Sequence, residues 1–347
     1  MRHTKTLLSC TTILIGLSAS AHAAKPFQPW VKQGRILPPG FAGQESTRRL
    51  SAPSVVKLKN GRLRMYFWAI GKSGSQFVFA AECETKSPTK WHMVSKQPML
   101  GPDRSGNLRN QGPSFPFVVR RDDGPWLMYF CSWGSWAKAG ELSNRTSMAI
   151  SKDKGLTWKV IKEPLLPLGG KGTFDAGMTG SVCVIRDDER YQMWYTAGER
   201  YLQLRTGKRG IVHLGYCTSK DGLAWNRYPK AVMSPRLKKA EPFEAVVSKP
   251  SVLKLKDGYH MWFSSYSLKG RGYQLAYASS KDGIRWKRAL GKRILELTPK
   301  GFDSRNQSYP NVIEVGDELW MYYVGNYFGN TGIGWAKMKK SDLGKIE

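Results

Sequence analysis

Three carboxyl side chains stand where they could work as a pair in acid–base chemistry. Asp175, Glu244 and Asp303 each come shortly before an apolar segment in the second half of the sequence. Two carboxyl groups that face each other across a glycosidic bond, about 5–5.5 Å apart for retention or about 6.5–9.5 Å for inversion, can hydrolyse it. One must be kept protonated by burial or a like charge, while its partner stays ionised near a cation. We therefore predict these three residues as catalytic, with the roles of acid, base and nucleophile unassigned.

Basic and amide side chains precede apolar segments in the same way. Guanidinium groups bind carboxylate or sulfate through two parallel hydrogen bonds, so we interpret these residues as contacts for a sugar, or for an anionic sugar that carries uronate or sulfate groups. The alternative is that they form salt bridges with the acids beside them. The predicted substrate-binding residues are Arg49, Arg109, Gln111, Lys249, Arg305 and Asn306.

The sequence lacks motifs for metal-dependent or nucleophilic catalysis. His92, His213 and His260 are isolated, and the sequence contains no Cys-x-x-Cys or His-Glu-x-x-His pattern. It contains no Gly-x-Ser-x-Gly nucleophile elbow either. We predict no metal and no cofactor, and leave open only a bound calcium or other ion. Tyr327 and Phe328, together with other loop aromatics, are candidates for stacking on sugar rings.

The candidate residues occupy one place in a repeat of about sixty residues. An apolar segment, a turn and an aromatic segment occur five times, and the apolar segments begin at residues 53, 113, 180, 250 and 310. A third segment follows and ends in a turn closed by tryptophan, as in Ser280-Lys281-Asp282-Gly283-Ile284-Arg285-Trp286. Four short strands per repeat are typical of a propeller blade. We predict an all-β fold, a five-bladed β-propeller of four-stranded blades around a central channel.

A propeller would bring the candidate residues together. The loop that enters each innermost strand opens at one mouth of the channel, so the three acids and the six binding residues are expected to converge there. The predicted organisation is a signal peptide over residues 1–23, an N-terminal extension over 24–44, the propeller over 45–340 and a C-terminal tail over 341–347.

Three segments connect this repeat to a known group of proteins. They are Gly172-Thr173-Phe174-Asp175, Glu244 ahead of Lys249-Pro250-Ser251-Val252, and Gly325-Asn326-Tyr327-Phe328-Gly329-Asn330-Thr331-Gly332-Ile333-Gly334. Over roughly residues 45–338 the chain resembles the five-bladed superfamily of glycoside hydrolase families 43, 32 and 130, and within it the uncharacterised bacterial members. The resemblance implies a propeller and a carbohydrate-active function.

The catalytic acids of family 43 do not carry over to this sequence. The positions nearest to those three acids are Ala52, Thr179 or Gly180, and Lys249. Two hypotheses therefore stand beside each other: a glycosidase that uses Asp175, Glu244 and Asp303, and a glycan-binding propeller that has lost hydrolysis. A third is recognition of a protein or membrane surface by charge.

Charge and the N-terminal segment bear on location and partner. Arg2 and Lys5, an apolar stretch from Leu7 to Leu17, and Ala21-His22-Ala23 are typical of a cleaved signal peptide. We expect a periplasmic or extracellular monomer with no integral membrane segment after cleavage. Lys and Arg number 55 against 26 Asp and Glu. For an exported protein this excess favours anionic lipid, cell-wall polymer or an anionic glycan over nucleic acid as the partner, and an ordinary solvated basic surface is the alternative. Cys83, Cys131, Cys183 and Cys217 are interpreted as buried thiols, with disulfides as the alternative.

Overall fold

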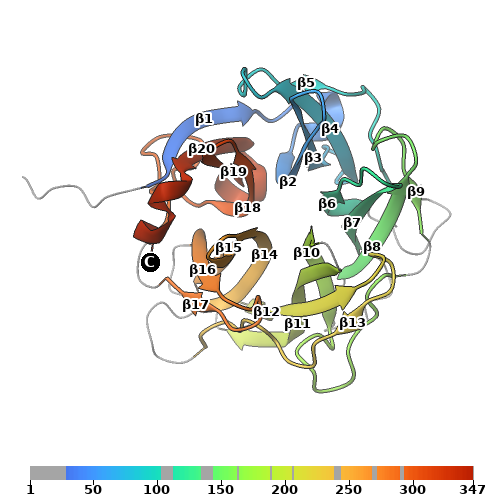
Figure 1. Cartoon of the computed structure of the whole chain (residues 1–347), viewed down its shortest axis with the longest axis vertical. Helices are drawn as coiled ribbons and strands as arrows, with labels where there is room; N and C mark the ends of the chain where they lie inside the picture. Colours follow the sequence, from blue (N-terminus) through green and yellow to red (C-terminus); the bar gives the residue numbers. More distant parts are fainter. Residues whose placement is uncertain are drawn as a thin grey trace, which may run out of the picture.

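The computed structural model describes residues 29–102, 112–133, 144–161, 164–187, 190–204, 207–237, 244–267, 272–289 and 293–346. In these ranges the chain forms β-sheets around a central axis, and its helical segments are short (Figure 1). The prediction of an all-β fold is confirmed. No helix in the described ranges is long and apolar enough to cross a membrane.

Two sheets follow the predicted pattern of four antiparallel strands, from an inner strand to a short strand at the rim. The first is β2 (Arg49–Lys57), β3 (Arg62–Ile70), β4 (Gln76–Glu84) and β5 (His92–Met93). The second is β6 (Pro113–Val119), β7 (Trp126–Trp133), β8 (Asn144–Ser151) and β9 (Lys159–Val160).

The next two repeats form one eight-stranded sheet. Its first half is β10 (Met178–Arg186), β11 (Tyr191–Leu204), β12 (Gly207–Ser219) and β13 (Asn226–Arg227). Its second half is β14 (Glu244–Leu255), β15 (Gly258–Ser267), β16 (Gly272–Ser280) and β17 (Lys287–Arg288). The halves meet through β12 and β14, which run parallel and pair at Val212 and Val246.

The last sheet contains both ends of the described chain, which corrects the predicted boundaries. β18 (Ser308–Val315), β19 (Glu318–Val324) and β20 (Ile333–Lys339) are completed at the rim by β1 (Val31–Leu37), antiparallel to β20. Residues 24–44 are therefore not simply an extension. The fifth repeat ends before a fourth strand, so its edge is paired by a strand from the other end of the chain. The tail also packs on the sheet, as the 3-10 helix η2 (Lys340–Ile346) with Leu343 buried.

Every inner strand has a β-bulge at the same place. The pairing registers shift between Ser51 and Ser54, Ser114 and Phe117, Thr179 and Val182, Ser248 and Ser251, and Ser308 and Asn311. In four strands the residue inside the bulge has a positive φ: Ala52 (47°), Phe115 (51°), Lys249 (47°) and Tyr309 (56°). This backbone costs a non-glycine residue about 1 kcal/mol or more. A bulge bends its strand and re-aims its side chains, so these four side chains share one unusual position.

Just beyond the bulges, hydrogen bonds join four pairs of neighbouring inner strands. A backbone N–H on one strand donates to a polar side chain of the preceding strand. The bonds are Val118 to Ser54 (2.9 Å), Val252 to Cys183 (3.1 Å), Val312 to Ser251 (2.8 Å) and Val55 to Asn311 (2.8 Å). The Val55–Asn311 bond connects the first sheet to the last.

Turns that contain Gly155, Gly222 and Gly283 join neighbouring repeats near the rim. The Tyr66 hydroxyl donates to the carbonyl of Gly155 (2.9 Å) and the Tyr129 hydroxyl to that of Gly222 (2.9 Å). The Trp194 indole donates to the carbonyl of Gly283 (2.7 Å). Each aromatic side chain belongs to a second strand and each glycine to the turn of a following repeat, so these motifs are structural.

The four cysteines in the described ranges are buried and free. Cys83, Cys131, Cys183 and Cys217 lie among the apolar and aromatic side chains of second, third and inner strands. The interpretation of these cysteines as buried thiols is confirmed.

Replacing Asn311 by alanine should weaken the junction between the first and last sheets. The Val55 N–H would stay buried without its acceptor, so we expect the free energy of unfolding to fall by about 1–3 kcal/mol. Urea unfolding of Asn311→Ala measures it, with Lys86→Ala as a control whose side chain is 83% exposed. Equal stability of the two variants would contradict a role for this bond.

Candidate functional site

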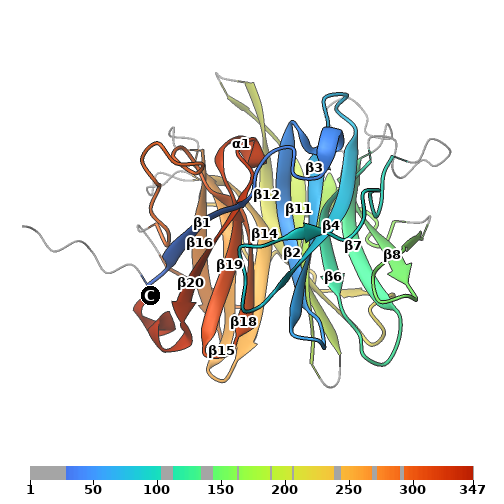
Figure 2. The same cartoon turned by 90° about the horizontal axis from the view of Figure 1, so that it is seen from above.

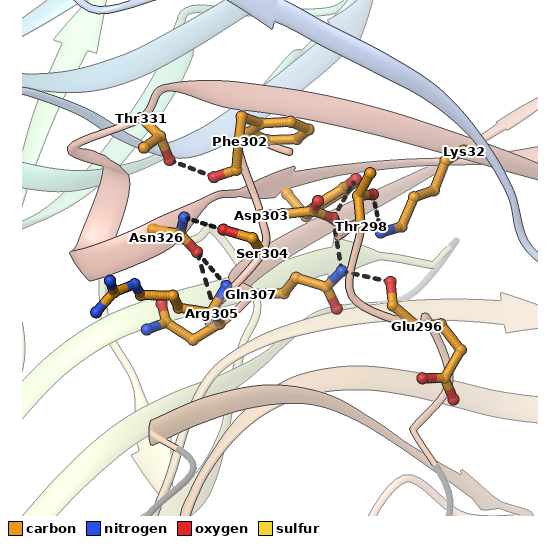
Figure 3. A network of polar contacts seen from close by, with 12 residues as sticks. Lys32, Glu296, Thr298, Phe302, Asp303, Ser304, Arg305, Gln307, Asn326 and Thr331 are labelled. Carbon is orange, nitrogen blue, oxygen red and sulfur yellow. Dashed lines mark hydrogen bonds and ion pairs between the residues drawn. The ribbon is translucent and has the colours of Figure 1, made fainter. Parts of the chain in front are cut away.

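Asp303 lies in a closed polar network at the last sheet. Its carboxylate accepts hydrogen bonds from Lys32 Nζ (2.5 Å), Gln307 Nε2 (2.7 Å) and the Tyr323 hydroxyl (3.1 Å) (Figure 3). The side chain is 0% exposed. Burial acts to raise the pKa of Asp303, but the hydrogen bonds from Lys32 and Gln307 outweigh it and lower that pKa below its ordinary value. A general acid needs the opposite shift.

Asp175 is held in a similar way at the first half of the eight-stranded sheet. It accepts hydrogen bonds from the Tyr195 hydroxyl (2.9 Å), Arg227 Nη1 (3.0 Å) and Thr173 Oγ1 (2.8 Å). The residue is 3% exposed. Burial and the neighbouring Asp175 carboxylate raise the pKa of Tyr195 well above its usual value, so this hydroxyl stays a hydrogen-bond donor.

Glu244 forms the third such network, at the second half of that sheet. Both guanidinium nitrogens of Arg288 donate to its carboxylate, at 2.9 and 2.6 Å, and the Ser265 hydroxyl donates to the same group. Glu244 is 1% exposed. A bidentate guanidinium–carboxylate pair is among the stronger hydrogen-bonded arrangements in proteins.

The three networks share one arrangement, which we call the carboxylate brace. In each, an acid at or before the inner strand meets a hydroxyl on the second strand and a cation on the rim strand of the same sheet. The cations are Lys32 on β1, Arg227 on β13 and Arg288 on β17. No hydrogen bond or ion pair among the described residues joins two of the three acids. The acids therefore tie inner strands to the rim, and their cation partners Lys32, Arg227 and Arg288 are not among the residues predicted to bind substrate.

Three predicted binding residues converge on one segment. α1 (Asn326–Gly329) follows β19 and lies at one end of the propeller (Figure 2). The Tyr327 hydroxyl accepts a hydrogen bond from Arg305 Nη1 (2.5 Å), and the Tyr327 N–H donates to Asn306 Oδ1 (3.0 Å). Arg49 Nε donates to Asn330 Oδ1 (3.2 Å) just after α1.

The side chain of Asn326 holds the backbone of the segment that leads into β18. Its Oδ1 accepts the backbone N–H groups of Arg305 (2.8 Å) and Asn306 (3.0 Å), and its Nδ2 donates to Ser304 (Figure 3). Tyr327, the next residue, is 46% exposed and has φ 53°. A left-handed backbone in a tyrosine is strained, and such strain is concentrated at ligand sites.

Aromatic side chains from four elements meet beside α1, and with Arg49 they form what we call the mouth cluster. Its members are Arg49 on β2, Trp68 on β3, Phe115 on β6, Tyr309 on β18 and Phe328 on α1. Phe115 lies 4.9 Å from Tyr309 and 5.0 Å from Trp68 between ring centroids. The Arg49 guanidinium lies 5.8 Å from the Trp68 ring and 5.5 Å from that of Phe328. Burial lowers the pKa of Arg49, so this cation is partly removed from water.

Further aromatics extend the mouth cluster toward the fourth repeat. Tyr273 lies 5.3 Å from Phe328 and 5.1 Å from Tyr266 between ring centroids. Sequence reasoning included Tyr327 and Phe328 but missed Trp68, Phe115 and Tyr309. A signal existed for two of these, because a residue before proline stands at the bulge in Ala52-Pro53, Phe115-Pro116, Lys249-Pro250 and Tyr309-Pro310.

The other predicted binding residues are not part of this group. Lys249 is 0% exposed, so a glycan at the surface does not reach it in this structure, because the bulge turns its side chain into the protein. Arg109 and Gln111 lie outside the described residues. In the parts of the chain that the structure describes, no three His, Cys, Asp or Glu side chains are grouped as metal ligands would be.

Comparisons with known proteins identify the fold. No family model matches the chain. Two uncharacterised proteins of Mycobacterium tuberculosis, from strains CDC 1551 and H37Rv, are each 25% identical over 312 residues, covering 89% of this chain and 99% of theirs. A 1,2-beta-oligomannan phosphorylase of Thermoanaerobacter sp. strain X514 is 23% identical over 176 residues, 48% of this chain and 58% of that protein.

Solved structures of similar shape are glycoside hydrolases and their relatives. The structure of BT0996 in a complex with RGII has a TM-score of 0.69 at 19% identity, covering 89% of this chain and 91% of that protein. A thermostable family-43 glycoside hydrolase scores 0.64 at 18% identity, over 83% and 88% of the two proteins. A member of the GH130 mannoside phosphorylases and hydrolases scores 0.62 at 16% identity, over 92% and 93%. The chain thus has the propeller-type fold of family 43 and family 130 proteins, as the resemblance implied.

The brace at Asp303 predicts a pH dependence of stability. Because the folded pKa of Asp303 is lowered, its ionised form stabilises the fold fully above the unfolded pKa of about 4. This contribution is lost as the pH falls through the lowered folded pKa. Asp303→Asn should be less stable than wild type at pH 7, by roughly 1–3 kcal/mol, and should lose less on acidification.

Urea unfolding at a series of pH values measures this difference. Asp317→Asn, at an exposed turn, is the control and should follow the wild-type curve. If Asp303→Asn and wild type lose stability in parallel as the pH falls, the carboxylate does not act as a brace.

Proposed function

We propose that this chain is an exported propeller that binds a glycan at the α1 end of its channel. The observation that carries the proposal is the convergence of Arg49, Arg305 and Asn306 on α1, beside the aromatic rings of the mouth cluster. Ligand sites for sugars need apolar surface together with a few placed polar groups. Here the exposed Tyr327 ring and the partly buried Phe115 and Phe328 rings supply the apolar surface, since Trp68 and Tyr309 are buried beneath them. The shared fold of carbohydrate-active proteins adds support.

We take the propeller to have five blades. Five inner strands carry the same bulge, and the two halves of the eight-stranded sheet are linked by the pairing of Val212 with Val246. Each half has the strand order of one blade. Export rests on the signal-like pattern of residues 1–23, which lie outside the described residues, and we expect the mature protein to be a monomer.

An anionic glycan is the ligand class that the charges favour. Arg49 is half-buried against Trp68 and Phe328, and Arg305 lies over Tyr327 with its guanidinium 5.6 Å from the ring centroid. A guanidinium that is partly removed from water gains from a carboxylate or sulfate partner. The formal net charge of +29 acts in the same direction by attracting polyanions.

We favour glycan binding without hydrolysis over hydrolysis catalysed by Asp175, Glu244 and Asp303. Each of these carboxylates is already paired with a cation in a brace. Hydrolysis by these acids is the second candidate, supported by the fold and by their burial. It would require at least two braces to open and to face the same sugar. In this proposal the braces stay closed and the mouth cluster recognises the glycan.

Substitutions at the mouth cluster should weaken binding. Arg49→Gln removes a charged contact worth about 1.5–3 kcal/mol, so affinity for polygalacturonate or a sulfated polysaccharide should fall about tenfold or more. Arg285→Gln is the matched control, because Arg285 lies on an Asp-Gly turn with a side chain 90% exposed. Calorimetry or biolayer interferometry measures both. An equal loss in the two variants would point to bulk charge and against a site at α1.

Release of reducing ends separates binding from hydrolysis. We expect the purified protein to bind a polysaccharide from a panel of neutral and anionic polymers and to release no reducing ends from it. Asp175→Asn should behave in the same way, once its folding is checked by circular dichroism. Release by the wild type that is abolished in Asp175→Asn would overturn the non-catalytic assignment.

A further inference from the structure

The side chain of Lys249 lies inside the ring of inner strands. Its Nζ is 5.7 Å from the centroid of the Phe117 ring, although Lys249 belongs to β14 and Phe117 to β6. β10 stands between these two strands and packs against both (Figure 1). The amine of Lys249 therefore reaches past β10 to a side chain of β6.

This buried ammonium lacks a counter-ion among the described residues. Lys249 is 0% exposed, and no side chain in the described ranges accepts a hydrogen bond from its Nζ. The titratable groups that interact with it are the thiols of Cys131 and Cys183. Burial raises the pKa of Cys183 to about 11 and that of Cys131 further, so both thiols are neutral at pH 7.

The amine nonetheless keeps most of its charge near neutrality. Burial lowers the pKa of Lys249 to about 8, which leaves the protonated form dominant at pH 7. An unpaired charge in a protein interior costs several kcal/mol. The backbone cost of φ 47° adds to this. A small anion beside Nζ would offset the charge penalty directly.

Unpaired hydroxyl groups occur at the same level of the inner strands. Ser51, Ser248 and Ser308 hold equivalent positions, one residue before the bulge in β2, β14 and β18. All three are buried, and in the described part of the chain their Oγ atoms have no hydrogen-bond partner. The inner strands thus carry buried hydroxyl groups for which no described residue supplies a hydrogen-bond partner.

We propose that the channel binds one small monovalent anion, of the size of chloride, beside Lys249 Nζ. Lys249 is fully buried, which excludes a sugar ring at the amine, and a halide would also have to displace the side chains packed around Nζ. The site is separate from the mouth cluster and does not depend on the glycan-binding proposal.

Thermal unfolding at constant ionic strength tests the site in solution. Sodium methanesulfonate, whose anion is larger, is replaced stepwise by sodium chloride or bromide. Wild type should show a saturable rise in Tm of about 2–5 °C. Lys249→Met, which keeps the length and removes the charge, should show none. Lys254→Met is the control, since Lys254 lies on β14 with a side chain 49% exposed, and it should respond like wild type.

Two further experiments test the anion site if Lys249→Met fails to fold. Crystals of the wild-type protein grown in bromide should show an anomalous peak next to Lys249 Nζ. Galacturonate monosaccharide should give no saturable rise in Tm through this site. An absent peak, a halide response that Lys249→Met retains, or stabilisation by galacturonate but by neither halide would overturn the proposal.

Discussion

The bulge in each inner strand is the constraint on which the rest of the structure depends. It bends the strand where the sheets crowd together, and just beyond it side chains such as Ser54 and Asn311 accept N–H groups from the next strand. It also fixes which side chains face inward. Phe115 and Tyr309 meet in the mouth cluster, while the Lys249 amine lies 5.7 Å from the centroid of the Phe117 ring of β6. The repeated bulge thus helps to close the ring of strands and determines which side chains fill its interior.

The carboxylate braces change how the acidic residues are understood. Burial and a nearby cation are features of catalytic carboxyls, and Asp175, Glu244 and Asp303 have both. Their partners, however, are a rim-strand cation and a second-strand hydroxyl in the same sheet each time. A feature that recurs in three successive repeats is better explained by the architecture of the repeat than by one reaction centre. The positions that hold acids in family 43 correspond here to bulge residues or their neighbours.

Much of the fold could be predicted from the sequence, because the strand segments and Asp-Gly turns carry local signals. The turn of Asp282-Gly283 and its closing Trp286 is one example. The pairing of β1 with the last sheet could not be predicted from local signals, because Lys32 and Asp303, which pair with each other, are 271 residues apart in the chain. The sequence also predicted Arg49, Arg305 and Asn306 as binding residues, and all three contact the segment of residues 327–330. It could not show that Lys249 is buried, because that outcome depends on a positive φ that no residue type encodes.

The most direct test of the account is a crystal structure of the protein with an oligosaccharide fragment of a polymer that it binds. We predict sugar density at the α1 end, with a ring against the mouth cluster near Phe328 and an anionic group within hydrogen-bond distance of Arg49 or Arg305. The three braces should stay closed in that complex. Sugar bound at the opposite end of the channel, or bound between opened carboxylates of Asp175 and Glu244, would contradict the account.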